Sequence, residues 1–425
     1  MKYQAPRGMN DILPDAQKYW RFVEKVITQT VQARGFKRID LPLVEYADLY
    51  ARSTGEASDI VRKEMYYVSA GKSDKESGKL VLRPEGTPGV ARAYIEYGMR
   101  VLAQPVMLYY FGPFFRHDRP QAGRLRQFWQ FGLETIGSAD PVVDAQNIEL
   151  VWHIFKMLGL DDISIQINSI GDKNCRNNIK KVLLAYYKPH EKKLCLDCKE
   201  RIKKNPFRLL DCKEKSCEFL ISEAPQIIDY LDNHCRDHFK QVLEFLDQLE
   251  VPYDLNPRLV RGLDYYTRTT FEVVPSDTEG SQGSLAAGGR YDELIKLLGG
   301  NATPAIGFAF GIERIIERLK KNGIEVSGDG KTDVLVACIG DLAKKKCVNL
   351  LSLLQKEGLS VASALGKGSI KAQLRLAQKL GASFTVIVGQ REAFDNNVIV
   401  RDMVNHSQET VAIADLVDFI KKKNK

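Results

Sequence analysis

Two long segments rich in aromatic side chains place the strongest constraint on the fold. Residues 106–116 carry five aromatic side chains, and residues 126–136 carry three. The segment between them, residues 117–125, is polar and contains Pro120 and Gly123. Two such runs separated by a short polar segment predict an antiparallel pair of strands joined by an exposed loop.

The rest of the pattern predicts more than one domain. The chain has 425 residues, whereas a single domain usually has about 100–200. We expect helices at 15–35 and 142–158, strands at 36–44, 79–83, 163–168, 261–274 and 284–290, and a strand leading into a helix over 306–319. A polar linker at 326–332 precedes residues 333–425, where strands and helices alternate as in a small α/β domain.

Residues from about 175 to 256 differ from their surroundings, and we expect a mostly helical insertion there. Residues 188–215 carry ten Lys or Arg against five Asp or Glu. Four cysteines, Cys195, Cys198, Cys212 and Cys217, lie in the same stretch with a spacing that suits a structural zinc site. Ordinary reduced cysteines in a basic helical region are the open alternative.

Several function classes are excluded or left without support. No Walker-type phosphate loop and no dinucleotide-binding glycine motif is present, so a bound nucleotide would be held by side chains on a sheet. No apolar run resembles a signal peptide or a membrane span, and we therefore expect a cytoplasmic protein without membrane contact. The net charge of +8 permits a polyanionic partner but does not require one.

Two arginines stand where an anionic ligand could be held. Arg116 ends the first long strand, and Phe128 lies on the returning strand, where its ring could stack on a base. Arg314 follows the small and aromatic residues of 307–311 and opens a helix. Small residues let a ligand approach the backbone. Surface ion pairs and plain core aromatics remain the alternative on pattern alone.

These segments carry a resemblance to a known family. FRHDRPQAGRLRQFWQFGLETIG resembles motif 2 of class II aminoacyl-tRNA synthetases, GFAFGIERI resembles motif 3, and the first helix with the Pro42 segment resembles motif 1. APRGMNDILP, LRPEGTPGVARA, RGLDYYTRTTFEV and AAGGRYDELI are similar to signatures of the bacterial histidyl-tRNA synthetases. The resemblance implies an α+β fold with a catalytic domain over 1–325, built on a mainly antiparallel sheet flanked by helices, and an anticodon-binding α/β domain over 333–425.

The resemblance also implies an activity and its partners. The family activates L-histidine with ATP and Mg²⁺ to histidyl-adenylate and pyrophosphate, and then transfers histidine to the 3′ end of tRNA-His. Motif 1 implies a homodimer. The basic insertion would then contact the tRNA backbone, or else form a solvated face.

The family's site residues carry over by position. The resemblance implies catalytic roles for Arg116 and Arg261. It implies a histidine site formed by Glu85, Gly86, Thr87, Arg116, Gln130, Glu134, Arg261, Tyr265, Tyr266 and Tyr291. It implies an ATP site formed by Arg116, Arg124, Phe128 and Arg314, and contacts of Arg119 and Gln121 with the tRNA acceptor end. Asp118 departs from the family pattern, which has Glu at this position.

A non-catalytic relative that binds histidine and regulates histidine biosynthesis is the alternative function. Such paralogues resemble the same catalytic core. They usually lack the C-terminal module and lose active-site residues, whereas this chain keeps Arg116, Arg261, Arg314 and residues 333–425.

Overall fold

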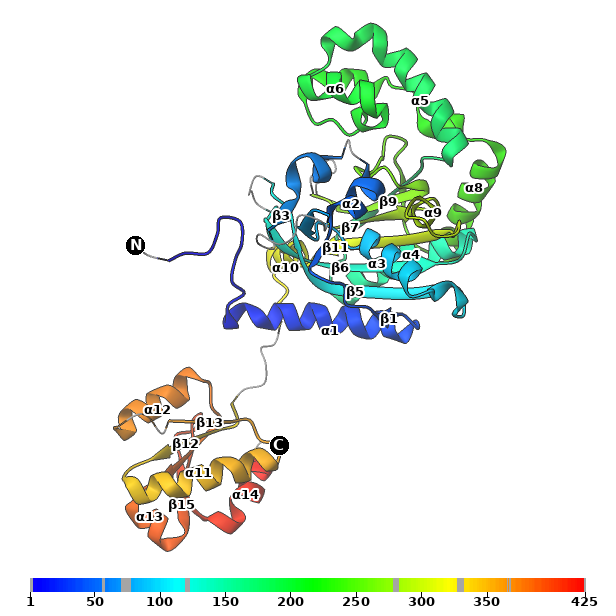
Figure 1. Ribbon diagram of the computed structural model, residues 1–425. Coiled ribbons are helices and arrows are strands. Elements are labelled where there is room, and N and C mark those ends of the chain that lie inside the picture. The colour runs from blue at the N-terminus through cyan, green and yellow to red at the C-terminus, as the bar shows by residue number, and fades with distance from the viewer. Residues whose placement is uncertain are drawn as a thin grey trace. The chain divides into compact units, whose positions relative to one another are not determined.

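The computed structural model describes residues 3–55, 58–69, 78–118, 123–277, 283–326, 332–364, 366 and 368–423. The chain divides into two compact units, Met1–Glu325 and Val326–Lys425 (Figure 1). Within the described residues, no helix is long and apolar enough to cross a membrane. Each unit is described by itself below.

The first unit is built on an eight-stranded sheet in the order β1-β5-β6-β11-β10-β9-β7-β8. Its strands are β1 (Lys37–Arg38), β5 (Val106–Phe115), β6 (Gln127–Ile136), β11 (Ala305–Gly311), β10 (Ala286–Arg290), β9 (Thr267–Pro275), β7 (Ile163–Ser169) and β8 (Asp254–Leu255). The six central strands are antiparallel, and only the short edge strands β1 and β8 pair in parallel. This confirms the predicted α+β fold with a mainly antiparallel sheet.

The predicted pair of long strands forms β5 and β6. Val106 pairs with Ile136 at one end of the ladder and Phe115 with Gln127 at the other. The backbone N–H of Arg116 donates to the carbonyl of Arg126 at 2.9 Å, which continues the pairing one step toward the turn.

Helices cover one face of this sheet and share a core with it. They are α1 (Gln17–Ala33), α4 (Pro141–Met157), α8 (Asn233–Gln248) and α10 (Ile312–Lys321). Ile27 of α1, Val151 of α4 and Leu319 of α10 are buried in one cluster with Phe131 and Phe308 of the sheet. Each helix has apolar residues at intervals of three and four, and so presents a continuous stripe to the sheet. In Figure 1, α1 runs along one side of this unit.

The strand-like run predicted over 36–44, with an interruption at Pro42, is not one strand but is divided between the edges of two sheets. The segment forms β1 in the large sheet and β2 (Val44–Tyr46) in a second sheet with β4 (Leu80–Leu82) and β3 (Tyr66–Val68). Arg83 explains the break, because its Nη1 donates to the carbonyl of Leu41 at 2.6 Å and its N–H to that of Leu43 at 2.9 Å. Between these two residues, Pro42 has no N–H to offer a neighbouring strand. Helices α2 (Ala47–Thr54), α3 (Thr87–Glu96) and α9 (Leu294–Leu297) complete this side.

The predicted strand over 261–274 begins later, at Thr267. The side chain of Arg176 explains the late start, because its Nη1 donates to the carbonyls of Asp264 and Tyr266 at 3.0 Å each. These carbonyls are engaged by a side chain rather than by a neighbouring strand. Residues 261–266 therefore form a non-strand segment that precedes β9.

The insertion is helical, as predicted. It contains α5 (Lys173–Tyr187), α6 (Leu196–Lys204), α7 (Lys215–Ser222) and α8, with short turns such as η5 (Pro206–Leu209) between them (Figure 1). Buried Leu183, Ile202 and Leu220 belong to the same apolar cluster as Tyr265 and Tyr266 of the first unit's sheet side. The insertion is thus packed continuously with the segment before β9.

The second unit is a mixed α/β sandwich. Its five strands have the order β13-β12-β14-β15-β16, parallel among the first three and antiparallel among the last three. The strands are β12 (Val334–Cys338), β13 (Val361–Ser363), β14 (Phe384–Val388), β15 (Asn397–Asp402) and β16 (Gln408–Ala412), and the helices are α11 (Asp341–Lys356), α12 (Ile370–Lys379), α13 (Gln390–Asp395) and α14 (Leu416–Lys423). The α/β pattern is confirmed. The β15–β16 hairpin and α13 were not predicted.

A buried ion pair fastens α4 to the centre of the sheet. Arg290 of β10 and Asp144 of α4 both have fully buried side chains, and Arg290 Nε donates to Asp144 Oδ1 at 2.7 Å. Thr269 of β9 donates to Asp144 Oδ2 at 2.6 Å, and Asp292 accepts from Arg290 Nη1 at 2.9 Å. Removing one partner of such a pair leaves an uncompensated buried charge.

We expect Asp144→Ala to lower the free energy of unfolding of the first unit by about 3–5 kcal/mol. Tryptophan fluorescence in urea measures this, because Trp20, Trp129 and Trp152, the protein's three tryptophans, all lie in that unit. Glu244→Ala removes an exposed i,i+4 partner of Lys240 and should cost less than about 0.5 kcal/mol. Equal losses of unfolding free energy in the two variants would show that the buried Arg290–Asp144 pair does not fasten α4 to the sheet.

Candidate active site

The face of the sheet opposite the helices carries the predicted site. Successive side chains of a strand point to opposite faces, so Phe128, Gln130 and Glu134 of β6 share one face. On the adjacent β11, Gly311 lies opposite Gln130 and Gly307 lies opposite Glu134. The intervening Phe308 and Phe310 are buried in the helix-covered core. The alternation of small and aromatic residues over 307–311 therefore leaves this part of the sheet almost bare of side chains.

Glu134 is buried in the middle of this face, with a relative exposure of 1%. Thr87 Oγ1 donates to its Oε1 at 2.6 Å, and the Tyr291 hydroxyl donates to Oε2. A Cβ atom on Gly307 would overlap the carboxyl group, so only glycine fits there. Burial raises the pKa of Glu134 to about 8, although both hydrogen bonds oppose this rise.

A second buried carboxyl group, that of Glu85, lies at the start of α3. It accepts a hydrogen bond from the Tyr265 hydroxyl at 2.9 Å. Burial raises its pKa to about 6, while the positive charge of Arg116 limits the rise. The next residue, Gly86, has no space for a side chain because the ring of Tyr110 occupies it. The structure thus brings together the predicted residues Glu85, Gly86 and Thr87.

Aromatic rings and one free acceptor complete this end of the site. The Tyr265 ring lies 4.6 Å from that of Tyr266 and 5.8 Å from that of Tyr291, centroid to centroid. Gln130 Oε1 is buried and has no hydrogen-bond partner among the described residues. A buried acceptor without a partner is costly unless a ligand supplies a donor. With two carboxyl groups nearby, this end of the site suits a cationic group.

Arg261 lies over the Tyr266 ring, with its guanidinium carbon 5.9 Å from the ring centroid. It forms an ion pair with Glu272 of β9, and its Nε is buried without a hydrogen-bond partner in the described part of the chain. Sequence reasoning did not identify Glu272. The signal in the sequence was an acidic residue placed between the apolar residues Phe271 and Val273. Burial raises the pKa of Glu272.

Positive charge gathers at the other end of the site. Arg116 Nε donates to the carbonyl of Pro84 at 2.9 Å, and its guanidinium carbon lies 5.3 Å from the Phe128 ring centroid. Arg314 Nε donates to the carbonyl of Gly123 at 3.0 Å. Burial and the charges of Arg124 and Arg116 lower the pKa of Arg314. Arginines that repel one another in a half-buried place indicate a site for an anion.

The loop between β5 and β6 holds the residues expected to contact tRNA. Arg119 and Gln121, expected at the tRNA acceptor end, fall outside the described residues. Asp118, the departure from the family pattern, accepts a hydrogen bond from Arg124 Nη1 at 3.1 Å. Its shorter side chain therefore still reaches an arginine of the site.

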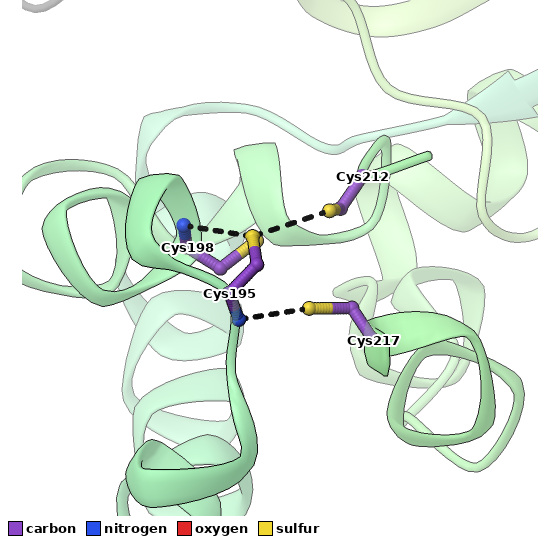
Figure 2. Close-up of side chains that lie close together, drawn as sticks. All are labelled: Cys195, Cys198, Cys212 and Cys217. Carbon is purple, nitrogen blue, oxygen red and sulfur yellow. Dashed lines mark hydrogen bonds between the residues drawn. The ribbon is translucent and has the colours of Figure 1, made fainter. Parts of the chain in front are cut away.

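The four cysteines of the insertion come together, as Figure 2 shows. Their Sγ atoms all lie within 4.8 Å of one another, and those of Cys195 and Cys212 are 3.8 Å apart. The N–H of Cys198 donates to Cys195 Sγ at 3.4 Å, and the N–H of Cys195 donates to Cys217 Sγ at 3.3 Å. Four sulfurs around a tetrahedral zinc with bonds of about 2.3 Å would be about 3.8 Å apart. The donor set and spacing thus fit a four-thiolate metal site.

A second group of possible metal ligands is explained by helix capping. Asp172 accepts from the N–H of Cys175 at 3.0 Å at the start of α5, and Asp232 accepts from the N–H of Cys235 at 2.8 Å at the start of α8. Both aspartates satisfy backbone donors that each helix leaves open.

Comparisons with known proteins agree with this geometry. A sequence profile described as "Histidyl-tRNA synthetase" matches residues 8–172 and 208–315, and one described as "Anticodon binding domain" matches residues 333–423. The histidine–tRNA ligase of Dehalococcoides mccartyi is 46% identical over 421 residues, which cover 99% of this chain and all of that protein. That of Halothermothrix orenii is 42% identical over 422 residues, with coverage of 99% and 100%.

Solved structures show the same similarity. The apo histidyl-tRNA synthetase of S. aureus superimposes with a TM-score of 0.82 at 36% identity, over 99% of this chain and 100% of that one. A Bacillus halodurans structure titled ATP phosphoribosyltransferase regulatory subunit/histidyl-tRNA synthetase has a TM-score of 0.65 at 20% identity, over 92% of this chain and 99% of that one. At that identity the second likeness shows the fold alone.

The raised pKa of Glu134 makes a prediction about stability. Between the ordinary pKa of 4.5 and the folded value of about 8, the folded protein holds a proton that the unfolded chain releases. The wild type therefore loses stability as pH rises through this window. Gln does not titrate, so Glu134→Gln should gain stability relative to the wild type by about 3 kcal/mol between pH 5 and pH 8.

Urea unfolding followed by tryptophan fluorescence at several pH values measures this difference. The exposed Glu317→Gln serves as the control and should follow the wild type. A difference between wild type and Glu134→Gln that does not change with pH would show that Glu134 is ionised in the folded protein at pH 5.

Proposed function

The chain belongs to the histidyl-tRNA synthetase family, and from that premise we propose that it joins L-histidine to tRNA-His in the cytoplasm through a histidyl-adenylate made with ATP. The observation that carries this proposal is the arrangement of the site, with buried carboxyl groups at one end and clustered arginines at the other. The ammonium and imidazole groups of histidine suit the carboxyl groups, and the phosphates of ATP suit the arginines.

The acidic end suits histidine. Glu134 and Tyr266 would interact with the two imidazole nitrogens, which differ as donor and acceptor. Tyr265 and Tyr291 would line the ring, and the ammonium group would be held by Glu85, Thr87 and the free Oε1 of Gln130. A buried pocket that pairs every polar group of its ligand discriminates strongly, because other amino acids leave these groups without partners.

The arginine-rich end suits ATP. Phe128 and Arg314 would lie on the two sides of the adenine ring, and Arg116 and Arg124 would contact phosphate oxygens. Arg116 also limits the rise in the pKa of Glu85, so its charge acts at both ends. It is therefore suited to hold the histidine carboxylate beside the α-phosphate. Mg²⁺, which enzymes of this class use with ATP, would neutralise phosphate charge.

The reaction needs positioning and charge stabilisation rather than a nucleophilic side chain. A carboxylate oxygen of histidine attacks the α-phosphorus, and pyrophosphate leaves from the opposite side. Arg261 would stabilise the negative charge that builds on the phosphoryl oxygens, with Glu272 fixing its guanidinium. The 3′-terminal hydroxyl of the tRNA then attacks the adenylate and releases AMP, with Arg119 and Gln121 at the acceptor end.

The second unit is assigned to anticodon binding, in line with its profile match. Because that unit is present and matches full-length ligases, the regulatory alternative has less support. We also propose a homodimer through the region that resembles motif 1. Exposed apolar side chains there, Leu43, Val44 and Tyr46, suit a protein contact.

We further propose that Cys195, Cys198, Cys212 and Cys217 hold a structural zinc. Hydrogen bonds with Cys198, Cys217 and Cys212 together outweigh the effect of burial and lower the pKa of the Cys195 thiol, whereas burial raises the pKa of the Cys212 thiol to about 11. Four thiolates leave no open position, so the metal would stabilise the insertion without taking part in the reaction.

Histidine-dependent ATP–pyrophosphate exchange tests the role of Arg261. We expect Arg261→Ala to lower kcat roughly 100- to 1,000-fold, since the removed charge acts on the transition state. Arg52→Ala, which removes an exposed arginine paired with Asp48, should leave the rate unchanged. Full activity of Arg261→Ala would remove Arg261 from the mechanism.

The same assay separates the two substrates at Glu134. Glu134→Ala should raise the KM for histidine about 100-fold, because the imidazole loses a buried hydrogen-bond partner, and should change the KM for ATP less than about twofold. An increase of similar size in both KM values would argue against a specific contact between Glu134 and histidine.

A further inference from the structure

Asn205 links the cysteine cluster to the segment before β9. It follows α6, which has Cys195 as its N-cap and Cys198 in its first turn, and it caps η5, after which the chain reaches Cys212. Its Oδ1 accepts from the N–H of Phe207 at 3.2 Å, and its Nδ2 donates to Asp264 Oδ1 at 2.6 Å. Cysteines of the cluster thus lie on both sides of this residue in the chain.

Asp264 is closely enclosed from the other side. A Cβ atom on Gly55, at the end of α2, would overlap Asp264 Oδ2. Gly55 has φ of +85°, which glycine adopts readily. With one oxygen against α2 and the other bonded to Asn205, the Asp264 side chain has little freedom to move.

A second contact from the insertion holds the same segment by its backbone. Arg176 of α5 donates to the carbonyls of Asp264 and Tyr266, and its guanidinium carbon lies 5.6 Å from the Phe207 ring centroid of η5. Between these two carbonyls lies Tyr265, which donates to Glu85. A shift of η5 would therefore move the tyrosines of the pocket.

We propose that Asn205 is a positioning residue for the histidine pocket, and that the four-cysteine site, by fixing the turn around Asn205, sets the affinity of the pocket for histidine. The proposal rests on the proposed function and deepens it. The match to the family's profile omits residues 173–207, which contain Asn205, Arg176, Cys195 and Cys198. Asp264, on the other side of the link, lies within the matched residues 208–315.

Asn205→Ala in the full-length protein tests the link. We expect the Kd for L-histidine, measured by calorimetry, to rise about tenfold, because a hydrogen bond to a charged group is lost. The KM for histidine should rise in parallel, with little change in kcat or in the KM for ATP, and zinc content by mass spectrometry should equal that of the wild type. The exposed Asn174→Ala of α5 is the matched control. An unchanged Kd in Asn205→Ala would overturn the proposal.

A paired exchange separates positioning from general damage. Asn205→Asp alone places two carboxylates together and should weaken histidine binding at least as much as Asn205→Ala. Combining Asn205→Asp with Asp264→Asn restores one donor and one acceptor, and should recover most of the affinity. If the paired exchange binds histidine no better than Asn205→Asp alone, the contact does not position the pocket.

Cys198→Ser tests the contribution of the metal. This variant should lose zinc and raise the Kd for histidine by a similar factor, and adding Asn205→Ala should raise it less than twofold further. Hydrogen exchange over residues 261–266, measured without histidine, should be about tenfold faster in both single variants. Exchange rates equal to those of the wild type in both variants would overturn this proposal, whether or not the protein binds histidine. Failure of the wild-type protein to bind histidine would instead count against the proposed function.

Discussion

The burial of the Glu134 carboxyl group in the middle of the sheet is the constraint on which the site depends. A buried carboxyl group needs donors, and Thr87 and Tyr291 supply them from two different elements. It also needs space, which Gly307 provides on the neighbouring strand. The remaining rise in pKa means that the folded protein keeps this group at a cost in stability. Such a cost is typical of a residue retained for its ligand.

The charges around Glu134 follow from the same constraint. Two carboxyl groups close together oppose each other's ionisation, and Glu85 indeed contributes to the raised pKa of Glu134. The positive charge of Arg116 lowers the pKa of Glu85 and so limits the rise that burial causes. The sheet thus carries a graded field, from carboxyl groups under the tyrosines to arginines around Phe128. An amino acid joined to a nucleotide has its charges in the complementary order.

Much of this could be predicted from the sequence, because strand alternation alone places Phe128, Gln130 and Glu134 on one face. The two long strands, the covering helices and the α/β second unit were also evident from periodicity. The division of 36–44 between two sheets was not evident, since it depends on Arg83, which is distant in the chain. The Arg261–Glu272 and Asn205–Asp264 contacts were missed for the same reason. They join residues whose spacing has no local pattern.

The central claim is that Glu134 recognises the imidazole ring, and ¹⁵N NMR of ring-labelled L-histidine bound to the protein tests it most directly. The account predicts that both ring nitrogens show shifts of fixed hydrogen bonds, one as donor and one as acceptor, and that Glu134→Gln moves at least one of them. Ring nitrogens with the averaged shifts of free histidine, unchanged by Glu134→Gln, would contradict the account.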